Sequence, residues 1–198
     1  MSVKSLTKTS TTSPDSRSRI EARMKSLFLC LLCLVLSTHA VADNKAAAIP
    51  MVSDLARDGA QAEREAKPVI LFFSLPGCPF CHVVRNNYLY PLLRDSKPKE
   101  RPVIREVDMA SAQSVQSFDR SSTSPRGIAQ KYKVIAAPTV IFVDASGCML
   151  APPIIGGDIA GVYGGYLDNA FDASAKKIAA AKKAGSGKKG AVQECAPP

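Results

Sequence analysis

Residues 73–82 read FSLPGCPFCH and contain two cysteines, Cys78 and Cys81, which are separated by two residues and followed by His82. A Cys-x-x-Cys pair serves three chemistries: a redox-active dithiol, covalent attachment of haem, and half of a zinc site. The run VILFF at 69–73 leads into the pair and is typical of a central strand that is buried on both faces. The fold and the chemistry therefore depend on what this strand and these cysteines belong to.

The N-terminal residues have the features of a targeting segment. Residues 24–42 combine a basic start, an uninterrupted apolar run at 27–36 and an A-x-A ending at 40–42, which are the parts of a secretory signal peptide. The apolar run is shorter than the about 20 residues that a membrane span needs. We therefore predict cleavage and export, with an uncleaved anchor as the alternative. Residues 1–23 are a Ser/Thr-rich leader extension, which is not translated if synthesis starts at Met24.

The six cysteines fall into groups by location. Cys30 and Cys33 lie in the apolar run and would leave with the signal peptide. Export would place the others in an oxidising compartment, where disulfides form and persist; these are Cys78, Cys81, Cys148 and Cys195. Cys148 and Cys195 each stand alone in the sequence, so a bridge between them and two free thiols both remain open.

The formal net charge of +9 comes from the two ends of the chain. Over residues 43–173 Lys and Arg balance Asp and Glu, and the excess lies in the leader and in lysines between 176 and 189. Residues 182–198 are low in complexity and are expected to form a disordered, solvated basic tail. We therefore expect no nucleic-acid partner, and contact with a membrane only during export.

Helical and strand patterns alternate along the mature chain. The expected elements are a helix at 49–66, a strand at 69–73, a helix at 82–94 kinked at Pro91, a strand at 103–107, a loop at 109–124, a helix at 125–132, a strand at 139–143, a turn at 144–147, a return strand at 148–151 and a helix at about 159–181. This order predicts a single α/β domain over residues 49–181, with a mixed central sheet flanked by helices on both faces.

The spacing of the cysteines suits redox chemistry. Two intervening residues bring the sulfur atoms within disulfide distance across one helical turn. Cys78 would lie at the helix N-terminus, where unpaired backbone N–H groups and the macrodipole stabilise a thiolate. Pro79 suits the first turn, because its missing N–H would find no helical partner there. Cys81 would be more buried and would resolve a mixed disulfide, and His82 would add positive charge when protonated.

Two other chemistries fit parts of the motif. C-x-x-C-H is also the attachment signature of c-type haem, with His82 as the axial ligand. The second ligand would then be Met51, Met109 or Met149. The apolar strand before the motif is not expected of a small helical cytochrome. A structural zinc site needs four ligands, and Cys148 and Cys195 are isolated, so we expect neither a metal nor another cofactor.

The combination of elements resembles the thioredoxin superfamily over about residues 50–180. The resemblance rests on the buried strand, on Cys78-Pro79-Phe80-Cys81 opening a helix, and on Ala136-Ala137-Pro138-Thr139 before a strand, a turn and a second strand. Cys-Pro-aromatic-Cys is similar to the glutaredoxin active site. Export and the histidine after the second cysteine resemble the periplasmic thiol–disulfide proteins of the Dsb and TlpA kind.

This resemblance implies a thioredoxin-like fold and exchange between thiols and disulfides. The catalytic residues that it implies are Cys78, Cys81 and Pro138. The supporting residues that it implies are Pro79, Phe80 and His82. In the family the proline matching Pro138 is cis and faces the dithiol, where it shapes the ledge on which the substrate docks. The substrates would be protein thiols and disulfides, with a redox partner protein or glutathione exchanging electrons. A non-catalytic binding module with the same fold is the alternative.

The sequence departs from thioredoxin itself at three places. Thioredoxin has a buried acid on the strand, six residues before the first cysteine, and this chain has Phe72 there. Gly77 replaces the tryptophan that usually flanks the motif. Ala137 precedes Pro138, so the ledge should be less bulky.

Gly156-Gly157-Asp158 resembles the segment with which glutaredoxins hold glutathione. A glycine pair lets the backbone approach a ligand closely, and N–H groups at a helix start bind a carboxylate. The segment is therefore a candidate ligand-binding site. The alternative is a flexible glycine-rich turn before the last helix, with Asp158 as its N-cap.

Overall fold

The computed structural model of the chain describes residues 48–97 and 99–185. The predicted leader and signal peptide, at 1–23 and 24–42, lie outside these residues, as does the part of the predicted tail that follows residue 185. In the described part of the chain, no helix is both long enough and apolar enough to cross a membrane.

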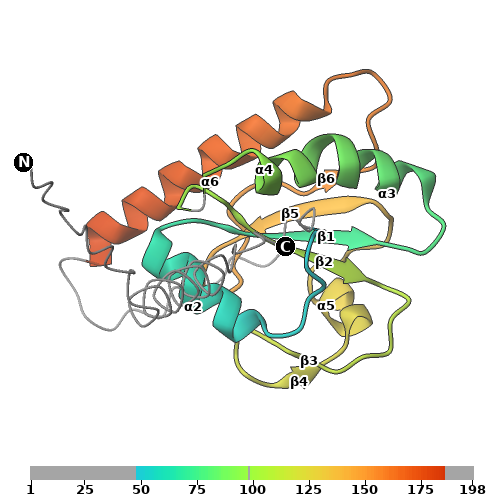
Figure 1. The fold of residues 1–198 in the computed structure, drawn as a ribbon. Coiled ribbons are helices and arrows are strands. Elements are labelled where there is room, and N and C mark those ends of the chain that lie inside the picture. The colour runs from blue at the N-terminus through green and yellow to red at the C-terminus, as the bar shows by residue number, and fades with distance from the viewer. Residues whose placement is uncertain (1–47, 98, 186–198) are drawn as a thin grey trace, which may run out of the picture. The chain divides into compact units, whose positions relative to one another are not determined.

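A four-stranded mixed sheet forms the centre of the described domain (Figure 1). Its strands, in the order in which they lie side by side, are β2 (Val103–Asp108), β1 (Val69–Ser74), β5 (Thr139–Val143) and β6 (Ile154–Ile155). β1 runs parallel to β2 and antiparallel to β5. Because Phe73 pairs with Thr139, the segment that follows β1 and the segment that precedes β5 lie at the same end of the sheet.

Helices cover both faces of this sheet, as the sequence predicts. One face carries α3 (Pro79–Val84), the π-helical η1 (Arg85–Leu89), α4 (Tyr90–Arg94) and α6 (Tyr163–Gly185), and the other carries α2 (Leu55–Glu65) and α5 (Pro125–Lys131). Alternate side chains of β1 enter the two cores. Ile70 and Phe72 pack on the α3 and α6 side, whereas Leu71 and Phe73 pack on the α2 and α5 side.

The first helix is shorter than the sequence pattern predicts. It begins at Leu55 and not near residue 49, because the Asp54 carboxylate accepts a hydrogen bond from the Arg57 backbone N–H at 2.8 Å and caps the helix there. The residues before it are extended along β2, where the Val52 N–H donates to the Glu106 carbonyl. An N-cap aspartate thus outweighs the helical spacing of the apolar residues upstream.

The C-terminal half also differs from the predicted elements. The return strand expected at 148–151 is reduced to a single antiparallel bridge, between Met149 and Val143, beside which the Leu150 N–H donates to the Phe142 carbonyl. The paired edge strand comes later, as β6, because Pro152 and Pro153 in between have no N–H to donate to a sheet. The expected loop at 109–124 contains a two-stranded hairpin of β3 (Val115–Gln116) and β4 (Ser122–Thr123).

The last helix begins later and ends later than predicted. α6 starts at Tyr163 because Gly161 has a left-handed φ of 71°, which interrupts a right-handed helix. It continues to Gly185, so the helix takes in the first residues of the segment that the sequence assigns to a disordered tail.

Candidate active site

Cys78 is the N-cap of α3 and follows β1 after a short turn at residues 75–77. Its Sγ accepts a hydrogen bond from the Cys81 backbone N–H at 3.1 Å. Pro79 occupies the first helical turn, where its missing N–H leaves no partner unsatisfied. The Cys78 sulfur therefore lies where free N–H groups and the positive end of the helix favour a thiolate.

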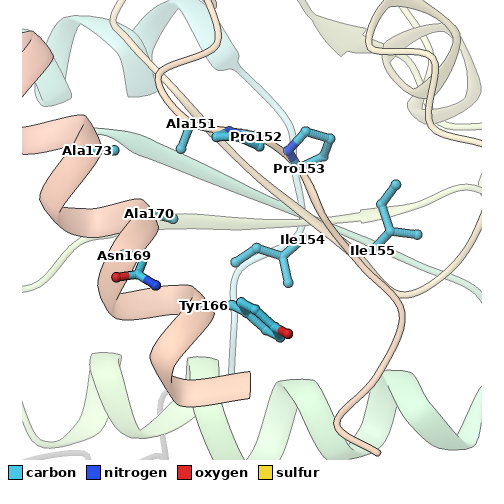
Figure 2. A pocket seen from close by; sticks show the side chains of 9 residues that line it. All are labelled: Ala151, Pro152, Pro153, Ile154, Ile155, Tyr166, Asn169, Ala170 and Ala173. Atoms are coloured by element: carbon cyan, nitrogen blue, oxygen red, sulfur yellow. The ribbon is translucent and has the colours of Figure 1, made fainter. Parts of the chain in front are cut away.

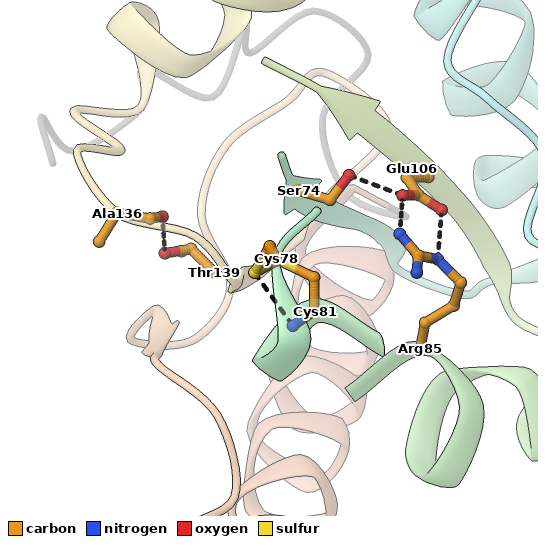
Figure 3. Close-up of a disulfide and its surroundings, with 7 residues drawn as sticks. All are labelled: Ser74, Cys78, Cys81, Arg85, Glu106, Ala136 and Thr139. Atoms are coloured by element: carbon orange, nitrogen blue, oxygen red, sulfur yellow. Dashed lines mark hydrogen bonds and ion pairs between the residues drawn. A yellow bond between two sulfur atoms is a disulfide. The ribbon is translucent and has the colours of Figure 1, made fainter. Parts of the chain in front are cut away.

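Cys78 and Cys81 form a disulfide, with their Cα atoms 5.2 Å apart (Figure 3). That separation lies within the usual range for disulfides. The two cysteines differ in burial: Cys81 has no exposed surface, whereas Cys78 is partly exposed. An incoming thiol or disulfide can therefore reach Cys78, while Cys81 is shielded behind it.

The segment before β5 completes the same end of the sheet. The Ala137–Pro138 peptide bond is cis, as the family resemblance implies. The Pro138 carbonyl accepts a hydrogen bond from the Gly156 N–H at 2.8 Å, and the Thr139 hydroxyl donates to the Ala136 carbonyl at 2.8 Å. Both the cis-proline and the glycine pair are thereby fixed at the dithiol end of the sheet.

Phe80 packs directly on Gly157. A Cβ atom at position 157 would lie 2.8 Å from the Phe80 side chain, so only glycine fits at this contact. Asp158 accepts a hydrogen bond from the Tyr88 hydroxyl, and this bond holds the pKa of the Asp158 carboxyl below its usual value. Backbone N–H groups of residues 161–163 act on that pKa in the same direction. The segment 156–158 is therefore tied to the helix that carries the dithiol.

The sheet separates His82 from two of the three methionines that could serve as the second haem ligand. His82 is exposed on α3. Met109 and Met149 pack against the core on the opposite face of the sheet. Among the described residues there is no group of three or more His, Cys, Asp or Glu side chains that would suit a metal ion.

A buried polar cluster lies next to α3, the dithiol helix that Cys78 caps and that contains Cys81 (Figure 3). The sequence interpretation missed this cluster. Glu106 on β2 is 7% exposed and accepts a hydrogen bond from the Ser74 hydroxyl at 2.6 Å. Its other partner is the Arg85 guanidinium, whose Nε donates at 2.9 Å and whose second nitrogen also donates to the carboxylate. These hydrogen bonds raise the pKa of Arg85.

Glu106 lies beside the position where thioredoxin has its buried acid. In the parallel register of β1 and β2, Glu106 pairs with Phe72. The guanidinium carbon of Arg85 lies 5.4 Å from the centre of the Phe72 ring. The buried carboxylate on this face therefore comes from the neighbouring strand. Its sequence signal is an acid two residues after Ile104, on the apolar face of a strand.

A cavity of about 400 Å³ lies between residues 151–155 and α6 (Figure 2). Tyr166 and Asn169 supply its polar side chains, and the rest of its lining is Ala, Pro and Ile. The cavity contains no charged group and no cysteine.

Similar solved structures include a thioredoxin-fold protein from Helicobacter pylori (18% identity, 58% of this chain and 81% of that chain, TM-score 0.43). A thioredoxin from Thermus thermophilus (18%, 62% and 87%, 0.43) and the oxidised C-terminal domain of DsbD from Neisseria meningitidis (20%, 60% and 97%, 0.39) are also similar. No curated protein sequence is significantly similar to this chain.

The family model of the thioredoxin-like domain matches residues 55–157, just over half of the 198 residues. The match includes β1, both cysteines, the cis-proline and the glycine pair. The chain therefore belongs to the thioredoxin-like domain family, within the thioredoxin superfamily.

Proposed function

We propose that the protein is an exported thiol–disulfide oxidoreductase that reduces or oxidises protein disulfides through Cys78 and Cys81. The observation that carries this proposal is the partly exposed Cys78 sulfur at the start of α3, which accepts the Cys81 N–H and is bonded to the buried Cys81 sulfur. A sulfur that the backbone favours as a thiolate, with a second sulfur in bonding reach, is what disulfide exchange requires.

In the reducing direction the Cys78 thiolate attacks one sulfur of a substrate disulfide. The substrate S–S bond breaks, its other sulfur leaves as a thiolate that takes up a proton, and a mixed disulfide with Cys78 forms. Cys81 then loses its proton and attacks the Cys78 sulfur, which releases the second substrate thiol. Two electrons pass from the dithiol to the substrate, and the Cys78–Cys81 disulfide remains. The same steps in reverse oxidise a substrate dithiol.

The surroundings of Cys78 give the substrate a place to dock. Phe80 is 51% exposed beside the dithiol, and it is held against Gly157. The cis-proline segment borders the site on the β5 side. We assign Pro138 to orient the substrate backbone, and Phe80 with residues 156–158 to contact its side chains. Pro79 shapes the first turn of the helix, and His82 is an exposed polar side chain next to Cys81.

A redox titration tests the proposal. The purified mature chain is equilibrated with mixtures of reduced and oxidised glutathione, and the free thiols are then alkylated and counted. We expect one two-electron transition between dithiol and disulfide, which Cys78→Ser abolishes. A pair that does not interconvert would refute the proposal. The midpoint also fixes the direction, because about 30 mV changes the equilibrium tenfold.

Two measurements separate the remaining alternatives. Attachment of c-type haem at Cys78, Cys81 and His82 would use both sulfurs as thioethers, and the purified protein would show a Soret band; we expect none. A non-catalytic binding module would keep its function in Cys78→Ser, whereas we expect loss. Export itself is tested by the N-terminal sequence of the secreted protein, which we expect to begin at residue 43.

A further inference from the structure

We propose that Arg85 and Glu106 set the reduction potential of the Cys78–Cys81 pair as mutually compensating charges. Arg85 favours the ionised sulfur of the reduced form, and Glu106 cancels most of that effect. Both are positioning residues, because they act on the sulfurs through the electric field and do not touch the substrate. The inference rests on the proposed redox function and deepens it.

The helix places Arg85 one turn beyond the buried cysteine. The Arg85 backbone N–H donates to the Cys81 carbonyl, which fixes the i, i+4 relation between the two residues. Side chains at that spacing are neighbours on one helix face, with about 5–6 Å between their Cβ atoms. The guanidinium also lies over Phe72, which belongs to the same core cluster as Cys81. The cation is therefore on the Cys81 side of the sheet.

The Arg85–Glu106 pair is buried enough for its charges to act on the sulfurs of Cys78 and Cys81. The Glu106 side chain is 9% exposed and the Arg85 side chain is 23% exposed. Charges in such surroundings are screened much less than charges at the surface. Ser74 and two nitrogens of Arg85 donate hydrogen bonds to the carboxylate. The intact pair is thus a fixed dipole of zero net charge beside the dithiol.

Removal of either partner leaves one uncompensated charge, and the two removals differ in sign. Glu106→Gln leaves a cation, which stabilises a thiolate and hence the reduced form. A stabilised reduced form makes the dithiol a stronger oxidant. Arg85→Gln leaves an anion, which disfavours the thiolate and makes the dithiol a stronger reductant. The disulfide carries no ionised sulfur, so the shift arises in the reduced form.

The chain contains a matched control on the opposite face of the same strand. Arg105 precedes Glu106 on β2 and binds Asp58 of α2 through two hydrogen bonds, at 2.8 and 2.6 Å. Asp58 is fully buried, and the Arg105 side chain is 16% exposed. This pair has the same chemistry and similar burial, but the sheet separates it from the dithiol.

The test is the glutathione titration, at one pH, of the wild-type mature chain and of four variants. Glu106→Gln should shift the dithiol–disulfide equilibrium about tenfold toward the dithiol, which is about 30 mV. Arg85→Gln should shift it by a similar factor toward the disulfide. The double variant Arg85→Gln/Glu106→Gln should return to within about twofold of wild type, and the control Asp58→Asn should not move it.

The signs of the shifts decide the outcome. The inference would be overturned if both single variants shifted the equilibrium in the same direction, or if neither shifted it. A pair with a purely structural role predicts no shifts of opposite sign. If a single variant does not fold, Arg85→Lys and Glu106→Asp, which keep the charges, should stay within about twofold of wild type; a larger shift would overturn it. Failure of the wild-type chain to cycle would refute the proposed function itself.

Discussion

β2 carries two buried ion pairs on its opposite faces. On one face Arg105 binds Asp58 of α2, and on the other Glu106 binds Arg85 at the end of the dithiol helix. Both carboxylates are almost completely shielded from solvent, and both receive two nitrogens of an arginine. Adjacent residues of one strand thus place similar chemistry in two different surroundings.

The difference lies in the neighbours of the two pairs. Around Asp58 and Arg105 are the apolar residues between α2, α5 and the sheet, with no cysteine among them. The core around Arg85 and Glu106 contains Cys81, with Cys78 packed against it. We infer that the first pair only holds the fold together, whereas the second both holds the fold and sets the charge that the sulfurs experience.

The largest effect on the dithiol face of β2 is expected from replacing the Cys78 sulfur. Cys78→Ser should abolish turnover with a disulfide substrate, since no other sulfur can form the mixed disulfide at the start of α3. The measurement is the rate of disulfide reduction by the reduced protein under excess dithiol. Cys81→Ser, the matched control, should instead trap the mixed disulfide, which is visible by mass spectrometry. Turnover in Cys78→Ser would assign the exchange to a different sulfur.

The next largest effect is a loss of stability, which we expect on both faces of β2. Asp58→Asn and Glu106→Gln should each lower the free energy of unfolding by about 3 kcal/mol, because each leaves a mostly buried arginine without the carboxylate that accepts its hydrogen bonds. Denaturant unfolding of the two variants measures this. Only Glu106→Gln should also change the redox midpoint. A loss below about 1 kcal/mol would show that the pair behaves like an exposed ion pair.

A smaller effect should distinguish docking from electrostatics on the dithiol face. Gly157→Ala should displace Phe80, since the new Cβ would lie 2.8 Å from its side chain. We expect kcat/KM for a protein disulfide to fall about tenfold, which corresponds to a rise of about 1.4 kcal/mol in the activation free energy. The redox midpoint should stay unchanged, because no charge is altered. A changed midpoint with unchanged kcat/KM would contradict this division of roles.

The smallest effect concerns the link between Asp158, in the segment before α6, and Tyr88 on η1. The hydrogen bond from Tyr88 lowers the pKa of Asp158 below its ordinary value of 3.8. A lowered folded-state pKa contributes stability above the ordinary value, and this stability is lost as the pH falls through the folded-state pKa. Tyr88→Phe should therefore be less stable than wild type at neutral pH, and the difference should shrink in acid below pH 3.8. A constant difference across this pH range would show that the bond does not act through ionisation.

The sequence predicts well those features that depend on neighbours along the chain. The apolar run becomes β1, and a Cys-Pro dipeptide after a strand places Cys78 at a helix start. The cis-proline follows from the family resemblance. Gly161 delays the start of α6, and Pro152 and Pro153 displace the paired edge strand to β6. Both signals can be read from the sequence, but a prediction from the surrounding helical and apolar patterns gives them too little weight.

The cluster around Glu106 could not be predicted in the same way. Arg85 and Glu106 are 21 residues apart in sequence, and they meet only because β2 lies next to β1 with Glu106 opposite Phe72. Register between parallel strands is a tertiary feature, set by which faces are buried. The absence of an acid at residue 72 is readable from the sequence, but its counterpart on the next strand is not.

The most direct single test is the pH dependence of alkylation of the reduced protein, followed residue by residue. We predict that Cys78 reacts as a thiolate with a pKa well below the about 8.5 of a free cysteine, while Cys81 stays unreactive. A Cys78 that titrates like free cysteine, or a Cys81 that reacts equally fast, would contradict the assignment of these two sulfurs as nucleophile and resolving thiol.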